Sequence, residues 1–563
     1  MSNKYGQNFG STKITPQSQP IPGSSQIKNS AGGYSFGVSD EILLDRFLIL
    51  GTEGGSYYAS EREMTYKVGD AARRLIAKDG QYVVNRVVEI SLAGRAPKND
   101  PAILILAACA TEGDQRTKEA AYQAVNQVCR IGTHIFQFAQ FMTELKGGSA
   151  GWGKGLQRAI ARWYNDKADN DLGYQVIKYQ NRAGWTHADL LQQAHVIPAS
   201  DAHDAIFGWA RADRNAARVE HRKDDPEFVD PAEKRYRHGV KGDASMLPAI
   251  FEAHRKMQEA TTAKQAIKVL ADHPSFPWEG IPSELLGKAE VWEALAPNLP
   301  MTATLRNLAR MTASGALATG NDVAKAIVKK LGDEEAIRKA KVHPIGVLTA
   351  MMTYKQGHGM RGDLRWTPVT KVIDALDEAF YLAFGNIVPT EKRWVLGLDI
   401  SGSMTMGTIA GVPGLTPMIA AAAMSMVTAR TERNYEMMAF CHEFRPIDIS
   451  PRQRLDDVYN KMYEMSKQMG GTDCSLPMIW AQQNKVEADV FVTYTDNETW
   501  AGTIHPTQAL EQYRQVMGIP AKMIVVGMVA NSFSVADPKD PWQLDVVGFD
   551  MATPNLINEF ARM

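Results

Sequence analysis

The spacing of apolar residues changes near Pro389, and no other feature of the chain limits its fold more. Upstream, apolar side chains recur at steps of three and four, as in QYVVNRVVEISL at 81–92. This spacing is typical of an amphipathic helix. Downstream, short β-prone runs alternate with helical windows, and the total length of 563 residues exceeds what one hydrophobic core usually organises. We therefore expect a multidomain protein with two architectures.

The upstream part, residues 39–388, predicts an all-α array. Segment 118–145 carries the apolar stripe at greater length and indicates two helices that meet near Gly132. Further helical windows follow, separated by short breaks that contain Gly, Pro or Asn. Helices joined by short turns pack antiparallel, so we expect stacked helical repeats of the HEAT kind. Segment 200–245 is dense in charge and predicts an insertion with loops.

The downstream part, residues 389–563, predicts an α/β domain. The β-prone runs KRWVLGLD, YEMMAF, ADVFVTYTD and AKMIVVGM alternate with helical windows such as TPMIAAAAMSMVTARTE. Alternation of this kind favours a mostly parallel, Rossmann-like sheet with helices on both faces. In such folds the binding loops lie beyond the carboxyl ends of the strands.

Composition indicates an intracellular protein. Residues 1–38, rich in Gly, Ser, Pro and Gln, predict a disordered tail and contain no signal peptide. The four cysteines form no CxxC pair, which favours a reducing, cytoplasmic location without disulfides or zinc. The longest apolar stretches are too short to cross a bilayer. The net charge of −1 hides an excess of basic residues upstream, where we expect any polyanion to bind.

Oxygen-bearing side chains gather at three places in the downstream part. Asp399, Ser401 and Ser403 alternate in the loop GLDISGSM, Thr472 lies in the Gly-rich loop GGTDCS, and Asp496 ends the run VFVTYTD. Oxygen donors with limited negative charge favour Mg²⁺, with Mn²⁺ or Ca²⁺ as alternatives. Taken alone, the DxSxS pattern is equally compatible with a simple polar turn.

The complete set resembles the metal-ion-dependent adhesion site of von Willebrand factor A domains, which combines DxSxS, a later Thr and an Asp at a strand end. All five positions match. The resemblance implies that Ser401, Ser403 and Thr472 ligate the cation directly, whereas Asp399 and Asp496 act largely through water molecules. One coordination position would then be left for a partner's carboxylate.

Longer motifs narrow the resemblance to one family. The segments are 178–195, 305–315, 343–368, 470–482 and 495–506, and among them are KYQNRAGWTHADLLQQAH and HPIGVLTAMMTYKQGHGMRGDLRWTP. They resemble the TROVE-domain Ro ribonucleoproteins, a family that includes bacterial members, from about residue 40 to the C-terminus. Segment 200–245 does not align with the family.

This resemblance implies a ring of helical repeats whose ends are joined by the von Willebrand factor A domain. Members of the family bind small noncoding Y RNAs on the outer basic surface. They also bind misfolded or unprocessed RNAs by passing a single-stranded 3′ end through the ring. Bacterial members are associated with exoribonucleases in RNA maturation and decay, so an exoribonuclease is an expected partner. Neither DNA nor a membrane is expected.

A basic helix face is the first candidate for RNA binding. Lys154, Arg158 and Arg162 recur at steps of four, which places them on one side of a helix. Basic side chains bind phosphates through counterion release, with little sequence preference. A face of solvated charges with no ligand is the alternative.

A second candidate mixes cations with aromatic residues. Lys178, Arg182 and His187 lie in a segment that also holds Tyr179 and Trp185. Cations and stacking surfaces together bind single-stranded RNA. For Trp185 a place in the core is favoured instead.

A third candidate is the glycine-rich motif YKQGHGMRGDLRW. It carries Lys355, His358, Arg361 and Arg365 among three glycines. Glycine allows a backbone to approach a ligand closely, and Arg forms bidentate contacts with phosphate. We expect either an RNA-facing loop at the inner edge of the ring or a structural turn with salt bridges. His343, upstream of this motif, is expected to start a helix.

The leading hypothesis is a noncatalytic RNA-binding protein that acts in RNA quality control. The alternatives are a scaffold that binds a partner protein through the metal and, less favoured, a metal-dependent nuclease. Two-metal phosphoryl chemistry needs several carboxylates, whereas hydroxyls dominate the set proposed here. The sequence also contains no GxxxxGK[ST], HExxH or nucleophile-elbow motif.

Overall fold

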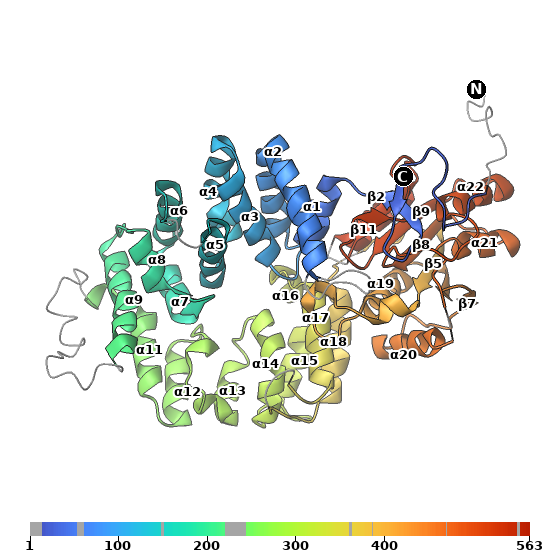
Figure 1. Cartoon of the computed structure of the whole chain (residues 1–563). Helices are drawn as coiled ribbons and strands as arrows, with labels where there is room; N and C mark the ends of the chain where they lie inside the picture. Colours follow the sequence, from blue (N-terminus) through green and yellow to red (C-terminus); the bar gives the residue numbers. More distant parts are fainter. Residues whose placement is uncertain are drawn as a thin grey trace.

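The computed structural model describes residues 14–52, 61–147, 151–219, 244–359, 363–385, 387–468, 470–548 and 552–563. Both expected architectures are present. A helical array is followed by an α/β domain, and the array curves into a ring that the α/β domain adjoins on one side (Figure 1).

The array consists of consecutive helices that pack mainly on their neighbours in the sequence. They are α1 (Asp40–Leu50), α2 (Glu61–Ala93), α3 (Asp100–Glu112), α4 (Gln115–Val128), α5 (Gly132–Leu145), α6 (Lys154–Asn165), α7 (Asp169–Lys178), α8 (His187–Gln193), α9 (Asp201–Val219), α11 (Ala249–Glu259), α12 (Ala263–Asp272), α13 (Ala289–Leu295), α14 (Met301–Ala313), α15 (Asp322–Leu331), α16 (Glu334–Lys339), α17 (Pro344–Lys355) and α18 (Thr370–Leu382).

Local signals set several helix ends. The predicted break near Gly132 is confirmed, since α5 begins at this residue, and a Cβ there would lie 2.7 Å from the Cβ of Tyr179. His343 caps α17 as expected, because its Nδ1 accepts a hydrogen bond from the Ile345 backbone N–H at 3.1 Å. Thr186 and Asp189 form a capping box that starts α8.

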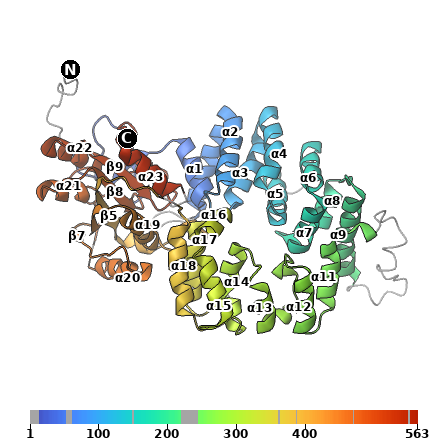
Figure 2. The same ribbon diagram turned by 180° about the vertical axis from the view of Figure 1, so that it is seen from behind.

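The ends of the array meet at a seam between the α2–α3 connection and the α16–α17 connection. Lys341 Nζ donates to the carbonyl of Leu92 at 3.2 Å, and His343 Nε2 donates to the carbonyl of Arg95 at 3.0 Å. Both views place α16 and α17 against the first helices (Figures 1 and 2). These contacts span about 250 positions of the sequence, so they close the ring.

The α/β domain is built on a six-stranded sheet in the order β11-β9-β8-β5-β6-β7, parallel except for the edge strand β7. The strands are β5 (Arg393–Asp399), β6 (Asn434–Phe440), β7 (Phe444–Pro446), β8 (Val490–Thr495), β9 (Lys522–Gly527) and β11 (Gln543–Val547). The helices are α19 (Pro417–Thr431), α20 (Leu455–Ser466), α21 (Leu476–Gln483), α22 (Pro506–Met517) and α23 (Thr553–Arg562).

Helices cover both faces of this sheet, as the sequence predicted. Side chains of β5 alternate between the faces, so that Leu396 and Leu398 pack with α19 and Val395 packs with α21 and α22. The core on the α19 face is continuous with the core of the helical array. The two parts therefore share one hydrophobic cluster.

The predicted disordered tail at 1–38 is wrong for residues 14–38. Residues 1–13 lie outside the described residues, but β1 (Gln26–Lys28) and β2 (Tyr34–Gly37) form a small sheet with β10 (Phe533–Ser534). Gln17 is fully buried and donates to Asp473 Oδ1 at 2.7 Å. Polar contacts to a distant domain hold this segment, and its composition does not reveal them.

The predicted loop insertion at 200–245 is wrong for its first part. Residues 201–219 form α9, which packs on α7 and α8 and continues the array. Residues 220–243 lie outside the described part of the chain.

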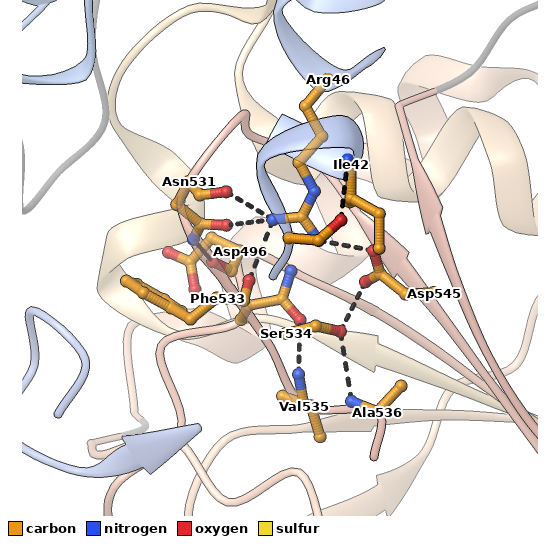
Figure 3. A network of polar contacts seen from close by, with 11 residues as sticks. Ile42, Arg46, Asp496, Asn531, Phe533, Ser534, Val535, Ala536 and Asp545 are labelled. Atoms are coloured by element: carbon orange, nitrogen blue, oxygen red, sulfur yellow. Dashed lines mark hydrogen bonds and ion pairs between the residues drawn. The ribbon is translucent and has the colours of Figure 1, made fainter. Parts of the chain in front are cut away.

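Arg46 of α1 joins the array to the α/β domain (Figure 3). Its side chain is fully buried, with Nη2 donating to Asp545 Oδ2 at 2.6 Å. Its Nη1 donates to the carbonyls of Asn531 and Phe533 at 2.5 and 2.9 Å. A buried guanidinium is tolerated only when its donors find such partners.

Replacing Arg46 tests this junction. We expect Arg46→Met to lower the free energy of unfolding by about 3 kcal/mol, because Asp545 loses its cation and two carbonyls lose a donor. The effect is measured by urea unfolding. Arg74→Met is the matched control, since Arg74 pairs with Asp40 on the exposed surface and its loss should change little. Equal stability of the two variants would contradict the assigned role of Arg46.

Candidate functional site

Four of the five predicted metal ligands come together at the carboxyl edge of the sheet. The fifth, Thr472, lies in a loop whose backbone contacts Cys441 after β6 and Trp500 after β8. Asp399 is the last residue of β5, and Asp496 directly follows β8, its neighbour in the sheet. Ser401 and Ser403 lie in the turn after β5, which includes the 3₁₀ helix η5 (Gly402–Thr405). All five side chains are buried, with at most 3% of any residue exposed.

Hydrogen bonds hold the oxygen atoms of this site in place. Asp399 Oδ1 accepts from the Ser401 backbone N–H at 2.9 Å, and Asp399 Oδ2 accepts from Thr495 Oγ1 at 2.6 Å. The hydroxyls of Ser401 and Ser403 lie 3.1 Å apart. Asp399, Ser401 and Ser403 therefore form one connected cluster of polar groups.

The electrostatics of the site favour a bound cation. Burial raises the pKa of Asp399 to about 7, with a further contribution from the charge of Asp496. Burial also raises the pKa of Asp496, against the effect of a hydrogen bond from Ser403. Two buried carboxylates next to hydroxyl donors fit a hard divalent cation, which would offset their repulsion.

The donor set also defines what kind of metal site this is. Within the described ranges, no group of three or more His, Cys, Asp or Glu residues is placed to hold a metal ion. A cation at this edge of the sheet would therefore depend on the hydroxyls of Ser401, Ser403 and Thr472 beside the two carboxylates.

Two supporting residues, Thr495 and Gln17, were not identified from the sequence. Thr495 fixes Asp399, and Asp473 Oδ1 accepts from the Ser475 backbone N–H at 2.9 Å, which shapes the loop that carries Thr472. Gln17 adds its own hydrogen bond to Asp473. The adjacency of Thr495 to Asp496 was a usable signal, whereas nothing local points to Gln17.

The first basic candidate lies on α6. Its apolar side is buried through Leu156, Ile160 and other residues, while Lys154 and Arg158 are exposed. Arg162 is half-buried on the last turn of the helix. The three cations thus lie on the side of α6 that faces away from the core.

The structure places the residues of the second candidate in different surroundings. Arg182 is exposed in a hairpin formed by β3 (Asn181–Arg182) and β4 (Trp185–Thr186). Lys178 ends α7 with 15% of its side chain exposed, and its Nζ lies 3.9 Å from Glu279 and 5.3 Å from the centre of the Tyr179 ring. Trp185, expected in the core, is half-buried and packs against Trp152 at 5.4 Å between ring centres.

His187 is the residue whose place differs most from the expectation. It is only 3% exposed, its Nδ1 is hydrogen-bonded to the Tyr164 hydroxyl at 2.8 Å, and its ring lies 4.8 Å from that of Phe136. Burial lowers its pKa to about 4. The prediction that His187 contacts RNA is therefore corrected. Its ring packs in the core, because it starts α8 on the face that meets α6.

The third candidate is described in part, and its described cations, Lys355, His358 and Arg365, are exposed. Lys355 forms a salt bridge with Asp456 of α20, which favours the structural alternative for this residue. His358 and Arg365 are exposed and pair through an isolated β-bridge. Arg361 lies outside the described residues.

The buried histidine predicts a pH dependence of stability. The folded pKa of His187, about 4, lies below its ordinary value of 6.5, so the unfolded chain binds the proton more readily between these values. Its contribution to stability is complete above pH 6.5 and is lost as the pH falls toward 4. We expect His187→Gln to reduce the slope of stability against pH in this window by up to about 1.4 kcal/mol per pH unit. Urea unfolding at a series of pH values measures this slope. If His187→Gln leaves the slope unchanged, the buried position of His187 is contradicted.

No helix in the part of the chain that the structure describes is long and apolar enough to span a membrane.

Comparison with known proteins covers nearly the whole chain. A family model of the TROVE domain matches residues 27–352, and a model described as the Ro60 vWA domain matches residues 393–561. The chain is 42% identical over 542 residues to the RNA-binding protein RO60 of Deinococcus radiodurans, covering 95% of each protein. It is 35% identical over 605 residues to the RNA-binding protein RO60 of Caenorhabditis elegans, covering 98% of this chain and 92% of that protein.

The fold has a solved counterpart. The crystal structure of the Deinococcus radiodurans RO (RSR) protein superposes with a TM-score of 0.65 at 38% identity, covering 93% of this chain and 99% of that one.

Proposed function

The chain belongs to the family of TROVE-domain Ro proteins, and from this membership we propose that it is a noncatalytic RNA-binding protein. The observation that carries the proposal is its identity of 42% and 35%, over nearly the full length, to two relatives named RNA-binding protein RO60. Similarity of this extent includes both the ring and the α/β domain.

The proposal extends to the kind of RNA. A Y-like small noncoding RNA binds the outer basic surface, and the ring takes the single-stranded 3′ end of a misfolded or precursor RNA. The protein acts in RNA quality control, maturation or decay in the cytoplasm, with an exoribonuclease as a partner.

The surface around α6 supports the first of these contacts. The Trp152–Trp185 pair brings the hairpin that carries Arg182 next to the start of α6, where Lys154 and Arg158 are exposed. Half-buried indole rings with cations around them can stack on unpaired bases while the cations bind phosphates. We call Lys154, Arg158 and Arg182 the α6 surface.

Neutralising the α6 surface tests RNA binding. We expect Lys154→Gln with Arg158→Gln and Arg182→Gln to weaken binding of a structured RNA with a single-stranded 3′ tail. For each lost contact to single-stranded RNA, the slope of log affinity against log salt falls by about 0.7. Electrophoretic mobility shift at several salt concentrations measures both effects.

The control removes the same number of charges elsewhere on the ring. Lys264→Gln, Lys268→Gln and Lys339→Gln change exposed lysines of α12 and α16. If both triple variants bind RNA equally well, the α6 surface is not the binding face. If the wild-type chain shows no shift at low salt, the proposed function itself is wrong.

A second function is supported by the site at the edge of the sheet. We propose that Asp399, Ser401, Ser403, Thr472 and Asp496 hold a divalent cation, with Mg²⁺ favoured over Mn²⁺ and Ca²⁺. A bound cation of this kind would supply a Lewis-acidic contact for a carboxylate of a protein partner. The nuclease alternative is less favoured, because the set holds two carboxylates and two-metal chemistry needs more.

Thermal unfolding tests the cation site. A ligand that binds only the folded chain raises its unfolding temperature, so we expect Mg²⁺ to stabilise the wild type. Ser401→Ala with Ser403→Ala should abolish this rise, because two of the proposed direct ligands are lost. Thr405→Ala is the matched control, since Thr405 is an exposed hydroxyl in the same turn that bonds the Gly402 carbonyl. The same Mg²⁺ response in the double variant would refute the ligand set.

A further inference from the structure

A cavity of about 470 Å³ lies at the seam of the ring. Four parts of the array line it: the α2–α3 connection, the start of α5, the first turns of α14, and the α16–α17 connection. The cavity is thus built by the contact that closes the array.

The charged side chains that line this cavity are all cations. They are Arg130, Arg306 and Lys341, and no Asp or Glu belongs to the lining formed by the described residues. Arg306 is exposed on α14 and has no hydrogen-bond or ion-pair partner among the residues that the structure describes. Three convergent cations without a carboxylate repel one another, and an anion relieves this repulsion.

Neutral groups of the lining are oriented by hydrogen bonds. Ser91 Oγ donates to Asn99 Oδ1 at 2.7 Å, and Arg130 Nη1 donates to Ser91 Oγ at 3.0 Å. The Asn99 amide nitrogen lies 3.4 Å from His134 Nδ1 and donates to the Val128 carbonyl at 2.8 Å. Burial lowers the pKa of His134 to about 4, so this ring is neutral at physiological pH.

Carboxylates close to the cavity are engaged elsewhere. Asp100 follows Asn99 of the lining in the sequence, and its carboxylate accepts a hydrogen bond from the Gln137 amide. It does not line the cavity.

The size and apolar part of the lining indicate more than a free inorganic anion. Leu305, Val342 and Pro97 contribute apolar surface beside the cations. A volume of about 470 Å³ lies in the range of small-molecule sites. One end of a ligand would meet guanidinium and ammonium groups, and the other a base-sized apolar wall.

We propose that this seam pocket binds a nucleotide through its phosphate group, with Arg130, Arg306 and Lys341 as the cationic contacts. The phosphate connects the α4–α5 connection, α14 and the α16–α17 connection through these three side chains, so occupancy strengthens the closure of the ring. The nucleotide is either free or one unit of an RNA strand. The inference goes beyond RNA binding by the α6 surface and does not depend on it.

Isothermal titration calorimetry of the full chain tests the pocket. Inorganic phosphate, uridine monophosphate and hexauridylate are titrated separately, and NaCl keeps the ionic strength equal in all titrations. We expect uridine monophosphate or hexauridylate to bind the wild type, and Arg306→Gln to weaken that binding by about tenfold or more, since one charge-assisted phosphate contact is lost. Arg306→Lys keeps the charge and should retain part of the affinity. Lys339→Gln, two residues before Lys341 and outside the lining, should bind as the wild type does.

The outcomes separate the source of the nucleotide and the two proposals. Binding of uridine monophosphate that depends on Arg306 supports a free nucleotide, and dependence seen with hexauridylate alone supports an RNA strand. If neither probe binds the wild type, or if Arg306→Gln leaves both affinities unchanged, the pocket proposal is wrong. If the wild type binds structured RNA but both pocket tests are negative, the pocket proposal is wrong and RNA binding by the α6 surface is not contradicted. If nucleotide binding depends on Arg306 but structured RNA gives no mobility shift, the pocket proposal is supported and the proposed RNA-binding function is wrong.

Discussion

The burial of Arg46 is the interaction on which the rest of this structure depends. A helical array closes only where helices distant in the sequence meet, as they do at the seam of Lys341 and His343. Here α18 leads directly into β5 through the chain, while α1 reaches the same domain through a guanidinium with no exposed surface. Removing such a charge from water is unfavourable unless it is paired, and the partners of Nη1 and Nη2 therefore favour one position of α1.

The same network connects ring closure with the candidate cation site. Asn531 accepts from Arg46, and its amide donates to the backbone carbonyl of Asp496 (Figure 3). The face of the sheet that carries α19 also shares one hydrophobic cluster with the array. The loop after β8 is therefore hydrogen-bonded to the residues that hold α1.

Several features of the fold could be predicted because their causes are local. The apolar stripe, the break at Gly132 and the cap at His343 each depend on residues within a few positions. The convergence of Asp399 and Asp496 was also predictable, since neighbouring parallel strands end at the same edge. The order of residues 14–38 was not, because Gln17 is held by a side chain more than 450 positions away.

The sequence by itself determined the helical and α/β halves, the family, and the donor set at the sheet edge, since these follow from short-range periodicity and motif spacing. Only the tertiary structure decided which polar residues are exposed. It placed His187 among aromatic rings and brought Arg130, Arg306 and Lys341 to one cavity. Burial and convergence of charge depend on which helices meet when the ring closes, and no local pattern records that contact.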